Sequence, residues 1–219
     1  MSFFRPLNKP TNPALPPATR DYSTLYHDKF NSILRLFFNQ IQNVFDNLLG
    51  PNGGQYIDCP NGVFFNTQDQ VYAADDTAYA IEFDSTYLSN GVALRPGSSS
   101  QIGVSVNGVY NFQYTGQVYT TTGSKVEVAV WIARGGSDIS YSTRINTVQS
   151  NNHYFEVLWN FDIDLAAGEY VELKTSIDAH APDVKLDAFA AVAPYPAGAS
   201  SVLTVNFIAP LPDPRPALP

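Results

Sequence analysis

The sequence predicts a mainly β protein: a jelly-roll β-sandwich head preceded by one amphipathic α-helix and a proline-rich extended arm. Aromatic residues are plentiful, with 14 Phe and 13 Tyr, whereas only 15% of the chain is charged. This composition is typical of proteins that bury large sheet faces. Apolar and polar residues alternate over several short segments after residue 56, as in strands with one wet face. Prolines crowd both ends, where they exclude helix and central strand.

Residues 1–20 form a predicted docking arm, and residues 210–219 form a second proline-rich segment. Five prolines in the arm favour an extended, polyproline II-like backbone. The chain has a net charge of −8, yet its first 35 residues carry an excess of basic side chains. We therefore expect Arg5, Lys9 and Arg20 to dock on an acidic partner surface. The alternative is that the acidic remainder is an ordinary solvated surface.

Residues 21–50 predict an amphipathic helix, with Asp21 or Ser23 as its N-cap and Gly50-Pro51 as its stop. Apolar residues recur three or four positions apart, and several pairs lie eleven apart, which indicates a nearly straight seam between helices. The predicted trimer seam consists of Tyr26, Phe30, Ile33, Phe37, Ile41, Val44 and Leu48, widened by Leu34, Phe38, Phe45 and Leu49. The alternative is a helix packed on its own head. A Gly/Pro-rich linker at residues 51–55 favours a detached helix that forms a trimeric bundle.

Residues 56–209 read as the head. Tyr110, Phe112, Tyr114 and Val118 share one face of a predicted strand, while the polar residues between them take the other face. Similar alternation follows in segments near residues 126–132, 155–163, 171–177 and 203–207. Glycine-containing turn signals separate these segments, including Asn90-Gly91, Gly135-Gly136 and the stretch from Pro194 to Gly198. Short strands with such turns predict a sandwich or barrel.

One segment carries a resemblance to a known superfamily. Gly108-Val109-Tyr110-Asn111-Phe112-Gln113-Tyr114 has the pattern Gly-x-Tyr-x-Phe-x-Tyr and resembles the signature strand of the tumour-necrosis-factor and complement globular-head superfamily. The resemblance implies a ten-strand jelly roll in which Tyr110, Phe112 and Tyr114 fill the core beside a trimer axis. We expect Trp159 to be a core or subunit-interface residue as well. The aromatic-Gly-aromatic pattern usual near the final strand of that superfamily is missing.

Further combinations, such as Gly62-Val63-Phe64-Phe65-Asn66-Thr67-Gln68 and Trp159-Asn160-Phe161, are similar to virion structural proteins of tailed phages that infect marine cyanobacteria. That resemblance implies a homotrimeric tail fibre, neck fibre, knob or head-decoration protein, assembled in the host cytoplasm. Its partners would be itself and other virion proteins of capsid, neck or tail. The alternative is a tail-fibre adhesin whose head binds host-surface glycan through loops at residues 120–124, 135–141 and 150–154.

The sequence offers few residues for chemistry. It contains no nucleotide-binding, zinc or metalloprotease motif, so we expect neither an enzyme nor a cofactor. Asp162 and Asp164 share a strand face and are the weak candidates for a glycosidase pair. Asp75-Asp76, or Asp183 with Asp187, are candidates for calcium, although no dense ligand loop supports them. A reactive role for Cys59 is disfavoured, and we expect this cysteine to be buried and inert.

Two partner classes are disfavoured by composition. A net charge of −8 argues against nucleic acid, because phosphate neutralisation needs a clustered basic surface. No stretch has the ~20 apolar residues that cross a bilayer, so we expect no membrane partner.

Overall fold

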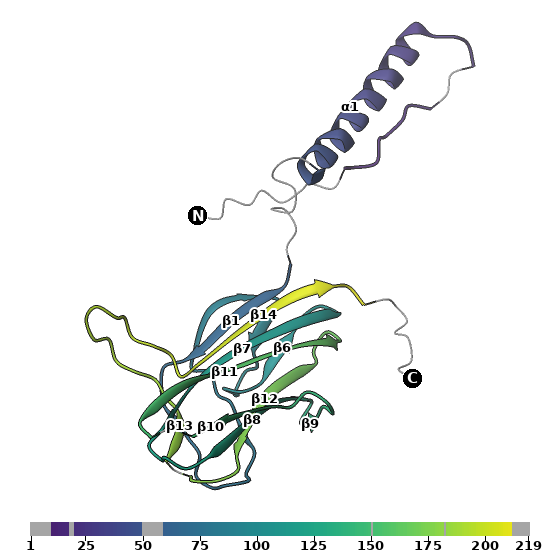
Figure 1. Ribbon diagram of the computed structural model, residues 1–219. Coiled ribbons are helices and arrows are strands. Elements are labelled where there is room, and N and C mark those ends of the chain that lie inside the picture. The colour runs from purple at the N-terminus through teal and green to yellow at the C-terminus, as the bar shows by residue number, and fades with distance from the viewer. Residues whose placement is uncertain (1–9, 18–19, 50–58, 150, 182, 212–219) are drawn as a thin grey trace. The chain divides into compact units, whose positions relative to one another are not determined.

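A computed structural model of the chain describes residues 10–17, 20–49, 59–149, 151–181 and 183–211 (Figure 1). Two compact units divide the chain, Met1–Asp58 and Cys59–Pro219, and we call the second unit the head. The predicted docking residues Arg5 and Lys9, the predicted linker at 51–55 and the tail from 212 lie outside the described residues. Each unit is described below by itself.

The helix α1 spans Thr24–Leu49. Ser23 caps it, because the backbone N–H of Tyr26 donates to Ser23 Oγ at 3.3 Å, as predicted. The predicted seam residues from Tyr26 to Val44 are half-buried along one side, whereas Leu36, Phe38 and Phe45 are exposed. Leu48 lies in the helix, but its side chain is not among those described. One apolar stripe is therefore partly covered within the first unit, and its flanks are not.

The arm supplies that partial cover. Pro10, Pro13 and Pro16 are half-buried while the residues between them are exposed, which is the three-residue period of a polyproline II helix with one face against a surface. The hydroxyl of Tyr26 donates to the carbonyl of Pro16 at 3.4 Å. Residues 10–17 thus lie beside α1 of the same chain, and Arg20 is exposed just before the helix.

The head is a β-sandwich of two seven-stranded sheets. In the first, sheet A, β2, β13, β7, β14, β1 and β4 are neighbours in that order and β11 pairs with the other edge of β7. These strands are β1 (Asn61–Asn66), β2 (Gln70–Val71), β4 (Ser85–Asn90), β7 (Gly108–Thr120), β11 (His153–Leu165), β13 (Val184–Leu186) and β14 (Ser201–Ala209). The strand that carries the Gly-x-Tyr-x-Phe-x-Tyr pattern, β7, lies between the edge strand β11 on one side and β13 and β14 on the other.

The second sheet, sheet B, has the order β10-β8-β12-β6-β5, with β3 on β12 and β9 on β8. Its strands are β3 (Tyr79–Ala80), β5 (Val92–Leu94), β6 (Ile102–Val104), β8 (Val126–Arg134), β9 (Ser137–Asp138), β10 (Arg144–Val148) and β12 (Tyr170–Ile177). All pairings between the strands of both sheets are antiparallel. Among the described strands, the chain crosses between the sheets after β2, β3, β4, β6, β7, β10, β11 and β12. The successive long strands therefore alternate between the sheets across the core, as in a jelly roll.

The core lies between the sheets and follows the predicted alternation. In β7 every second residue is buried, and Tyr110, Phe112 and Tyr114 are among the largest fully buried side chains. Trp159 is buried too, and its indole N–H donates to the carbonyl of Ser142 at 2.8 Å. The predicted core residues therefore fill the interior of a single head, which can supply its own stability. A position beside a trimer axis stays a prediction.

The chain enters and leaves the head at the same end. The N–H of Phe207 donates to the carbonyl of Pro60 at 2.9 Å, so the segment before β1 lies beside the last strand. Gly108 and Leu165 pair at that end, whereas Thr120 and His153 pair at the opposite end. We call the Thr120 end the far end of the head.

Candidate functional site

The outer side of four strands of sheet A is unusual for its lack of charge. The strands β1, β4, β7 and β14 contain no Asp, Glu, Lys or Arg, although 15% of the chain is charged. We call the outward side of these four strands the uncharged face. Its side chains include Val63, Phe65, Asn111, Gln113, Thr115, Gln117, Val202, Thr204 and Asn206, all half-buried or exposed. Depletion of charge is the compositional mark of the centre of a protein–protein interface.

Amide side chains form a ladder across part of this face. Asn111 Nδ2 donates to Asn160 Oδ1 at 2.7 Å and to Asp162 Oδ1 at 2.5 Å, and Gln113 Nε2 donates to Asn111 Oδ1 at 2.7 Å. The ladder runs from β7 to the edge strand β11, which brings the first charges. Because these amides bond to each other, the ladder is held in one arrangement and offers its remaining donors and acceptors outward.

A row of apolar side chains, interrupted by Thr115, crosses the same face. Leu158 and Val202 both lie opposite Thr115, one on each side of β7. Asn66 pairs with Ser201, so one step along this antiparallel register Phe65 lies opposite Val202. Leu158 is 63% exposed and Val202 is 37% exposed. Contiguous exposed apolar side chains on several strands mark an interaction surface better than scattered ones do.

The row continues into a groove. A pocket of about 430 Å³ is lined by Phe65, Thr67, Phe189 and the small residues Ala188, Ala190, Ala197, Gly198 and Ala199. Apart from the Thr67 hydroxyl, its side chains are apolar. Phe65 therefore belongs both to the apolar row and to this groove, and the two form one surface.

An ion-pair cluster lies beside the groove at the far end. Lys185 Nζ bonds to Asp69 Oδ2 at 2.6 Å and also to Asp187 Oδ1, and Tyr154 donates to Asp187 Oδ2 at 2.8 Å. The rings of Tyr154 and Tyr119 lie 4.5 Å apart. Asp187 is buried, so its charge requires these partners. Sequence analysis missed this cluster, although Lys185 and Asp187 lie two apart on one strand face, which is a visible signal.

The cluster shifts the pKa of several members. The hydrogen bonds to Asp187 and Asp69 raise the pKa of Lys185, and the hydrogen bond to Asp187 raises the pKa of Tyr154. Partial burial of Asp69 acts to raise its pKa, but hydrogen bonds from Lys185 and the Ala188 N–H outweigh burial and lower it. The charged forms of Lys185 and Asp69 are therefore both favoured, as expected of a structural ion pair.

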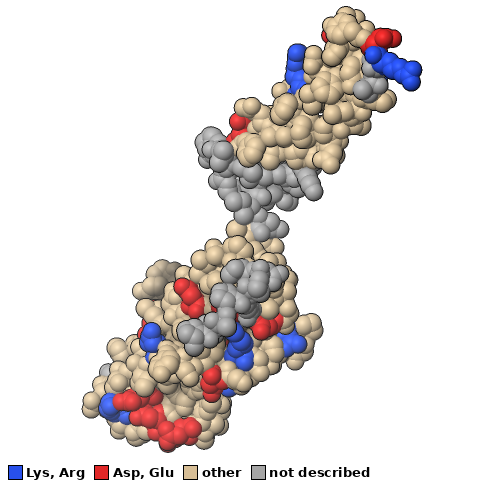
Figure 2. Space-filling model, turned by 90° about the vertical axis from the view of Figure 1, so that its right-hand side faces the viewer, with Lys and Arg blue, Asp and Glu red and all other residues tan. Residues whose placement is uncertain are grey.

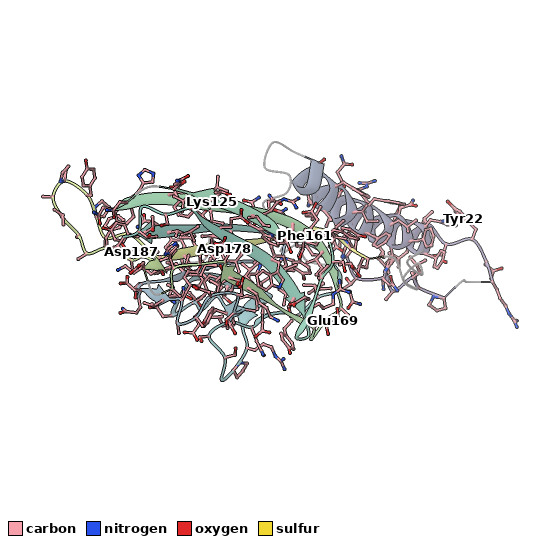
Figure 3. The ribbon with its side chains drawn as sticks, turned by 60° about the horizontal axis from the view of Figure 1, so that its bottom comes forward. Tyr22, Lys125, Phe161, Glu169, Asp178 and Asp187 are labelled. Carbon is pink, nitrogen blue, oxygen red and sulfur yellow. The ribbon has the colours of Figure 1, made fainter. Side chains whose placement is uncertain are left out.

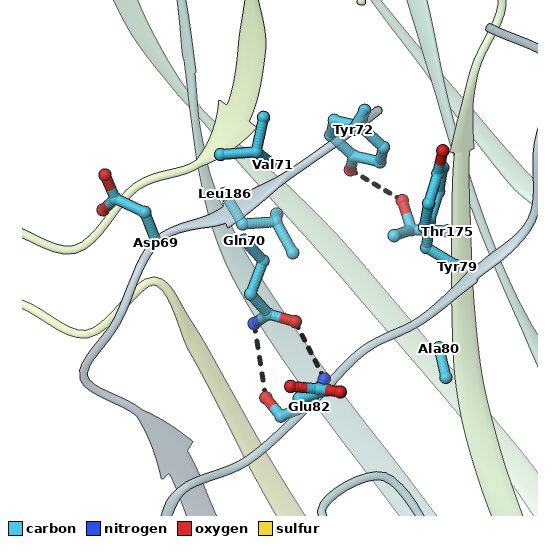
Figure 4. A pocket seen from close by; sticks show the side chains of 9 residues that line it. All are labelled: Asp69, Gln70, Val71, Tyr72, Tyr79, Ala80, Glu82, Thr175 and Leu186. Atoms are coloured by element: carbon cyan, nitrogen blue, oxygen red, sulfur yellow. Dashed lines mark hydrogen bonds between the residues drawn. The ribbon is translucent and has the colours of Figure 1, made fainter. Parts of the chain in front are cut away.

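A second pocket, of about 240 Å³, opens between the sheets beside β2 and β3 (Figure 4). Tyr72 and Thr175 share a hydrogen bond of 2.9 Å at its inner wall. The side chain of Gln70 bonds to the backbone of Glu82: it accepts from the Glu82 N–H at 2.8 Å and donates to the Glu82 carbonyl at 3.2 Å. Most of the polar groups here are already satisfied by the protein, and the volume is below the usual range for ligand sites.

The three loops predicted to contact glycan lie at different ends of the head. Tyr119 donates to Asn152 Oδ1 at 3.1 Å, which joins the neighbourhoods of the 120–124 and 150–154 loops at the far end. The third loop, at 135–141, begins at the opposite end of the head, where the chain enters. There the N–H of Gly135 donates to the carbonyl of Tyr170. Figure 3 shows the same separation, with Lys125 and Asp187 toward one end and Glu169 at the other. Ser150 lies outside the described residues.

Acidic side chains also gather at the far end, at the bottom of Figure 2. Ala181 N–H donates to Asp75 Oδ1 and Glu127 N–H donates to Asp178 Oδ1, so these carboxylates cap backbone groups. No group of three or more potential ligands for a metal ion occurs in the described part of the chain. Asp187, another predicted calcium candidate, forms an ion pair with Lys185.

The two candidates for a glycosidase pair lie on the edge strand β11. Asp162 accepts from Asn111, and Asp164 forms a salt bridge with Arg134 at 2.8 Å. Both therefore lie on the outer face of sheet A and take part in structural interactions. Cys59 is exposed, which makes the prediction of a buried cysteine wrong. Its position just before β1 explains this, because only its carbonyl is used by the head, accepting from Asn61 and Asn90.

Comparison with known proteins gives no further guide. No model of a protein family matches the chain, and no curated protein matches it either. Among the residues that the structure describes, none of the helical sequence is long and apolar enough to cross a membrane.

Proposed function

We propose that this chain is a non-enzymatic structural component of a tailed-phage virion, a homotrimeric tail or neck fibre or a head-decoration protein anchored through its N-terminal arm. The observation that carries the trimer is the uncharged face. In water, this face lacks the charged side chains that keep a protein surface soluble. Against identical neighbours, it buries apolar side chains without burying an unpaired charge.

The helix supports the same proposal. Leu36, Phe38 and Phe45 remain exposed on α1 even though the arm partly covers the stripe beside them. A helix that keeps large apolar side chains in water on its flanks is stabilised by association. Copies of the same helix supply such cover with matching length and spacing. We therefore assign α1 to a helical bundle formed by the copies of one trimer.

The arrangement of the ends supports an anchored head. The chain enters the head at Pro60 and leaves it after β14 at the same end, since the N–H of Phe207 donates to the carbonyl of Pro60. An arm that holds a particle at one end leaves the far end free to contact something else. The phage assignment itself comes from the resemblances of the sequence.

The test is the mass of the full-length protein at micromolar concentration. Size-exclusion chromatography with light scattering is expected to give three times the chain mass of 24.0 kDa. A stable monomer under these conditions would overturn the proposal. Cryo-electron microscopy of labelled particles would then locate the trimer, since exposed Cys59 accepts a maleimide label.

A second candidate is a glycan-binding adhesin head. One observation favours it: two of the three predicted loops meet at the far end, beside the neighbouring rings of Tyr119 and Tyr154. Exposed aromatic rings with polar neighbours are suited to sugar faces. Binding of the full-length protein to a glycan array, lost in Tyr154→Ala and kept in Tyr141→Ala, supports the adhesin. The absence of any binding to arrays and host cells favours a connector or decoration role.

A further inference from the structure

A hairpin at residues 188–199 lies between β13 and β14, which pair one after the other with the same edge of β7. β13 pairs with β7 as far as Leu186 opposite Val118, and β14 resumes with Ser201 opposite Gly116. Only Gln117 lies between these two positions. Its carbonyl accepts from the N–H of Asp187 at 2.8 Å, and its N–H donates to the carbonyl of Ser200 at 2.9 Å. Asp187 and Ser200 therefore both lie opposite Gln117, where a regular strand would have one residue. The hairpin leaves the sheet between these two residues.

The hairpin is rich in exposed apolar side chains. Residues 188–199 contain no charged residue, and all of residues 189–197 are exposed. At the tip Val192 is 67% exposed and Tyr195 is 69% exposed. The hairpin projects from the sandwich (yellow-green in Figure 1), so its own head leaves the tip in water. It adds apolar surface without completing the sheet, and a contact outside the subunit accounts for it.

The hairpin is also held in one shape. Val192 and Tyr195 exchange two backbone hydrogen bonds, and Phe189 and Gly198 exchange two more. The Phe189 ring packs across Gly198, where a Cβ would collide with it. Its base is fixed by the bond from Ala188 N–H to Asp69 and by the Lys185 cluster. A rigid apolar projection loses little conformational entropy when it binds.

One head carries both this projection and a groove that suits it. The groove is lined by Phe65, Thr67 and the base of the hairpin, and it opens onto the apolar row of the uncharged face. Neither tip nor groove bears a charge, although the chain as a whole is acidic. Two acidic copies approach most favourably through such surfaces. A projection with a separate receptor site generates a closed ring when the rotation between neighbouring copies closes, as in the proposed trimer.

We propose that the 188–199 hairpin of one subunit clasps the next subunit, with Val192 and Tyr195 lying against the groove lined by Phe65 and Thr67. This inference rests on the proposed homotrimer and names the contact that locks its heads together. In a trimer each subunit would give one hairpin and receive one. The contact extends the interface formed by the uncharged face toward the far end of the head.

The test uses full-length protein in three forms: wild type, Val192→Ser/Tyr195→Ser, and a deletion of residues 188–200. The deletion joins Asp187 to Ser201, so that one residue remains opposite Gln117 and the sheet register is kept. Either change is expected to raise the dissociation constant of the trimer by at least about tenfold, since buried tyrosines are frequent hot spots. Tyr141→Ser, which removes a tyrosine that is 96% exposed and belongs neither to the hairpin nor to the groove, is the matched control.

Cross-linking locates the contact directly. In a Cys59→Ser background, Val192→Cys with Thr67→Cys is expected to give covalent dimers and trimers, whereas Val192→Cys with Tyr141→Cys gives none. A wild-type trimer whose dissociation constant is unchanged by both hairpin variants, and which does not cross-link, overturns the clasp and leaves the trimer standing. A hairpin variant that stays trimeric but no longer binds host cells also overturns it. A monomeric wild type overturns the proposed function itself.

Discussion

The side-chain oxygens of Tyr72 and Thr175 lie 2.9 Å apart in the core and join the two sheets of the head. Tyr72 follows β2 of sheet A, and Thr175 belongs to β12 of sheet B. Both residues are buried, so each hydroxyl depends on the other for this hydrogen bond. A buried polar pair of this kind fixes how the sheets slide against each other, because every alternative packing leaves a hydroxyl unsatisfied.

Tyr72→Phe is therefore expected to lower the free energy of unfolding by about 1–2 kcal/mol, the cost of leaving the Thr175 hydroxyl buried without its partner. Urea unfolding followed by tryptophan fluorescence measures the change. Tyr87→Phe is the matched control, because Tyr87 is exposed on β4 and loses no hydrogen bond between buried groups. An equal effect of the two substitutions would contradict the role given to the pair.

Alkaline pH provides a second test of the same tyrosine. Burial raises the pKa of Tyr72 to about 12 and also raises the pKa of Tyr114. An acid whose pKa is raised by folding stays neutral in the folded state while the unfolded chain ionises. Stability is therefore full below pH 10 and falls as the pH rises from 10 toward 12, by on the order of 2–3 kcal/mol for Tyr72. Unfolding midpoints at pH 9 and pH 11.5 measure this loss, which should shrink in Tyr72→Phe.

Lys185→Met tests the ion-pair cluster at the far end. The substitution leaves the buried Asp187 carboxylate without its cation, and we expect a loss of about 3 kcal/mol of stability. Lys125→Met removes a cation that also pairs with a carboxylate, Glu127, but on the surface, and should change stability by less than about 1 kcal/mol. Thermal unfolding of both variants at neutral pH gives the comparison. Similar losses from the two would show that burial of Asp187 adds nothing.

Acid should weaken the same cluster. The pKa of Asp69 is lowered in the folded state, so its contribution is present above the unfolded value and is lost as the pH falls through the folded value. Wild-type stability should therefore drop below about pH 4 more steeply than that of Asp69→Asn. Urea midpoints between pH 7 and pH 2.5 measure the difference. If the urea midpoints of the two proteins fall in parallel with pH, Asp69 does not contribute to the acid sensitivity.

Phe37→Asp tests the helical seam of the proposed trimer. A carboxylate placed among the apolar residues of α1 is expected to raise the trimer dissociation constant by on the order of a hundredfold while the head stays folded. Asn39→Asp adds the same charge on the exposed polar side of the helix and serves as control. Light scattering over a dilution series reads out the trimer. If both variants dissociate at the wild-type concentration, the helix does not hold the subunits together.

Deletion of residues 1–20 tests the arm. The shortened protein is expected to remain a soluble trimer and to be missing from assembled particles, because Arg5, Lys9 and Arg20 are removed together. Arg5→Ala/Lys9→Ala separates the charges from the contact that Pro16 makes with Tyr26. Quantitative immunoblotting of purified particles gives the copy number. Incorporation at the wild-type level would exclude anchoring by this segment.

Much of the fold could be predicted because the long elements carry strong periodic patterns. Ser23 caps a helix whose apolar spacing is regular, and β7 alternates over thirteen residues. The shortest strands, such as β2 and β3, have two residues each and are too short for a period. Their existence depends on partners distant in the chain, such as Lys185 opposite Val71.

The candidate site was harder to predict for the same reason. The lack of charge in β7 and β14 is visible in the sequence, but its meaning depends on those strands lying side by side. The stretch from Pro194 to Gly198 reads as a turn, and nothing local shows that it projects from the head. Cys59 was misplaced because a single cysteine is usually buried, and its exposure depends on where the chain meets β1.

The single register position that Asp187 and Ser200 share makes the head a natural scaffold for display. The hydrogen bonds of Gln117 depend only on where the chain departs and returns, so the length and composition of what lies between are open to change. A foreign peptide grafted in place of residues 188–199 should therefore leave the two sheets of the head intact and be presented at its far end.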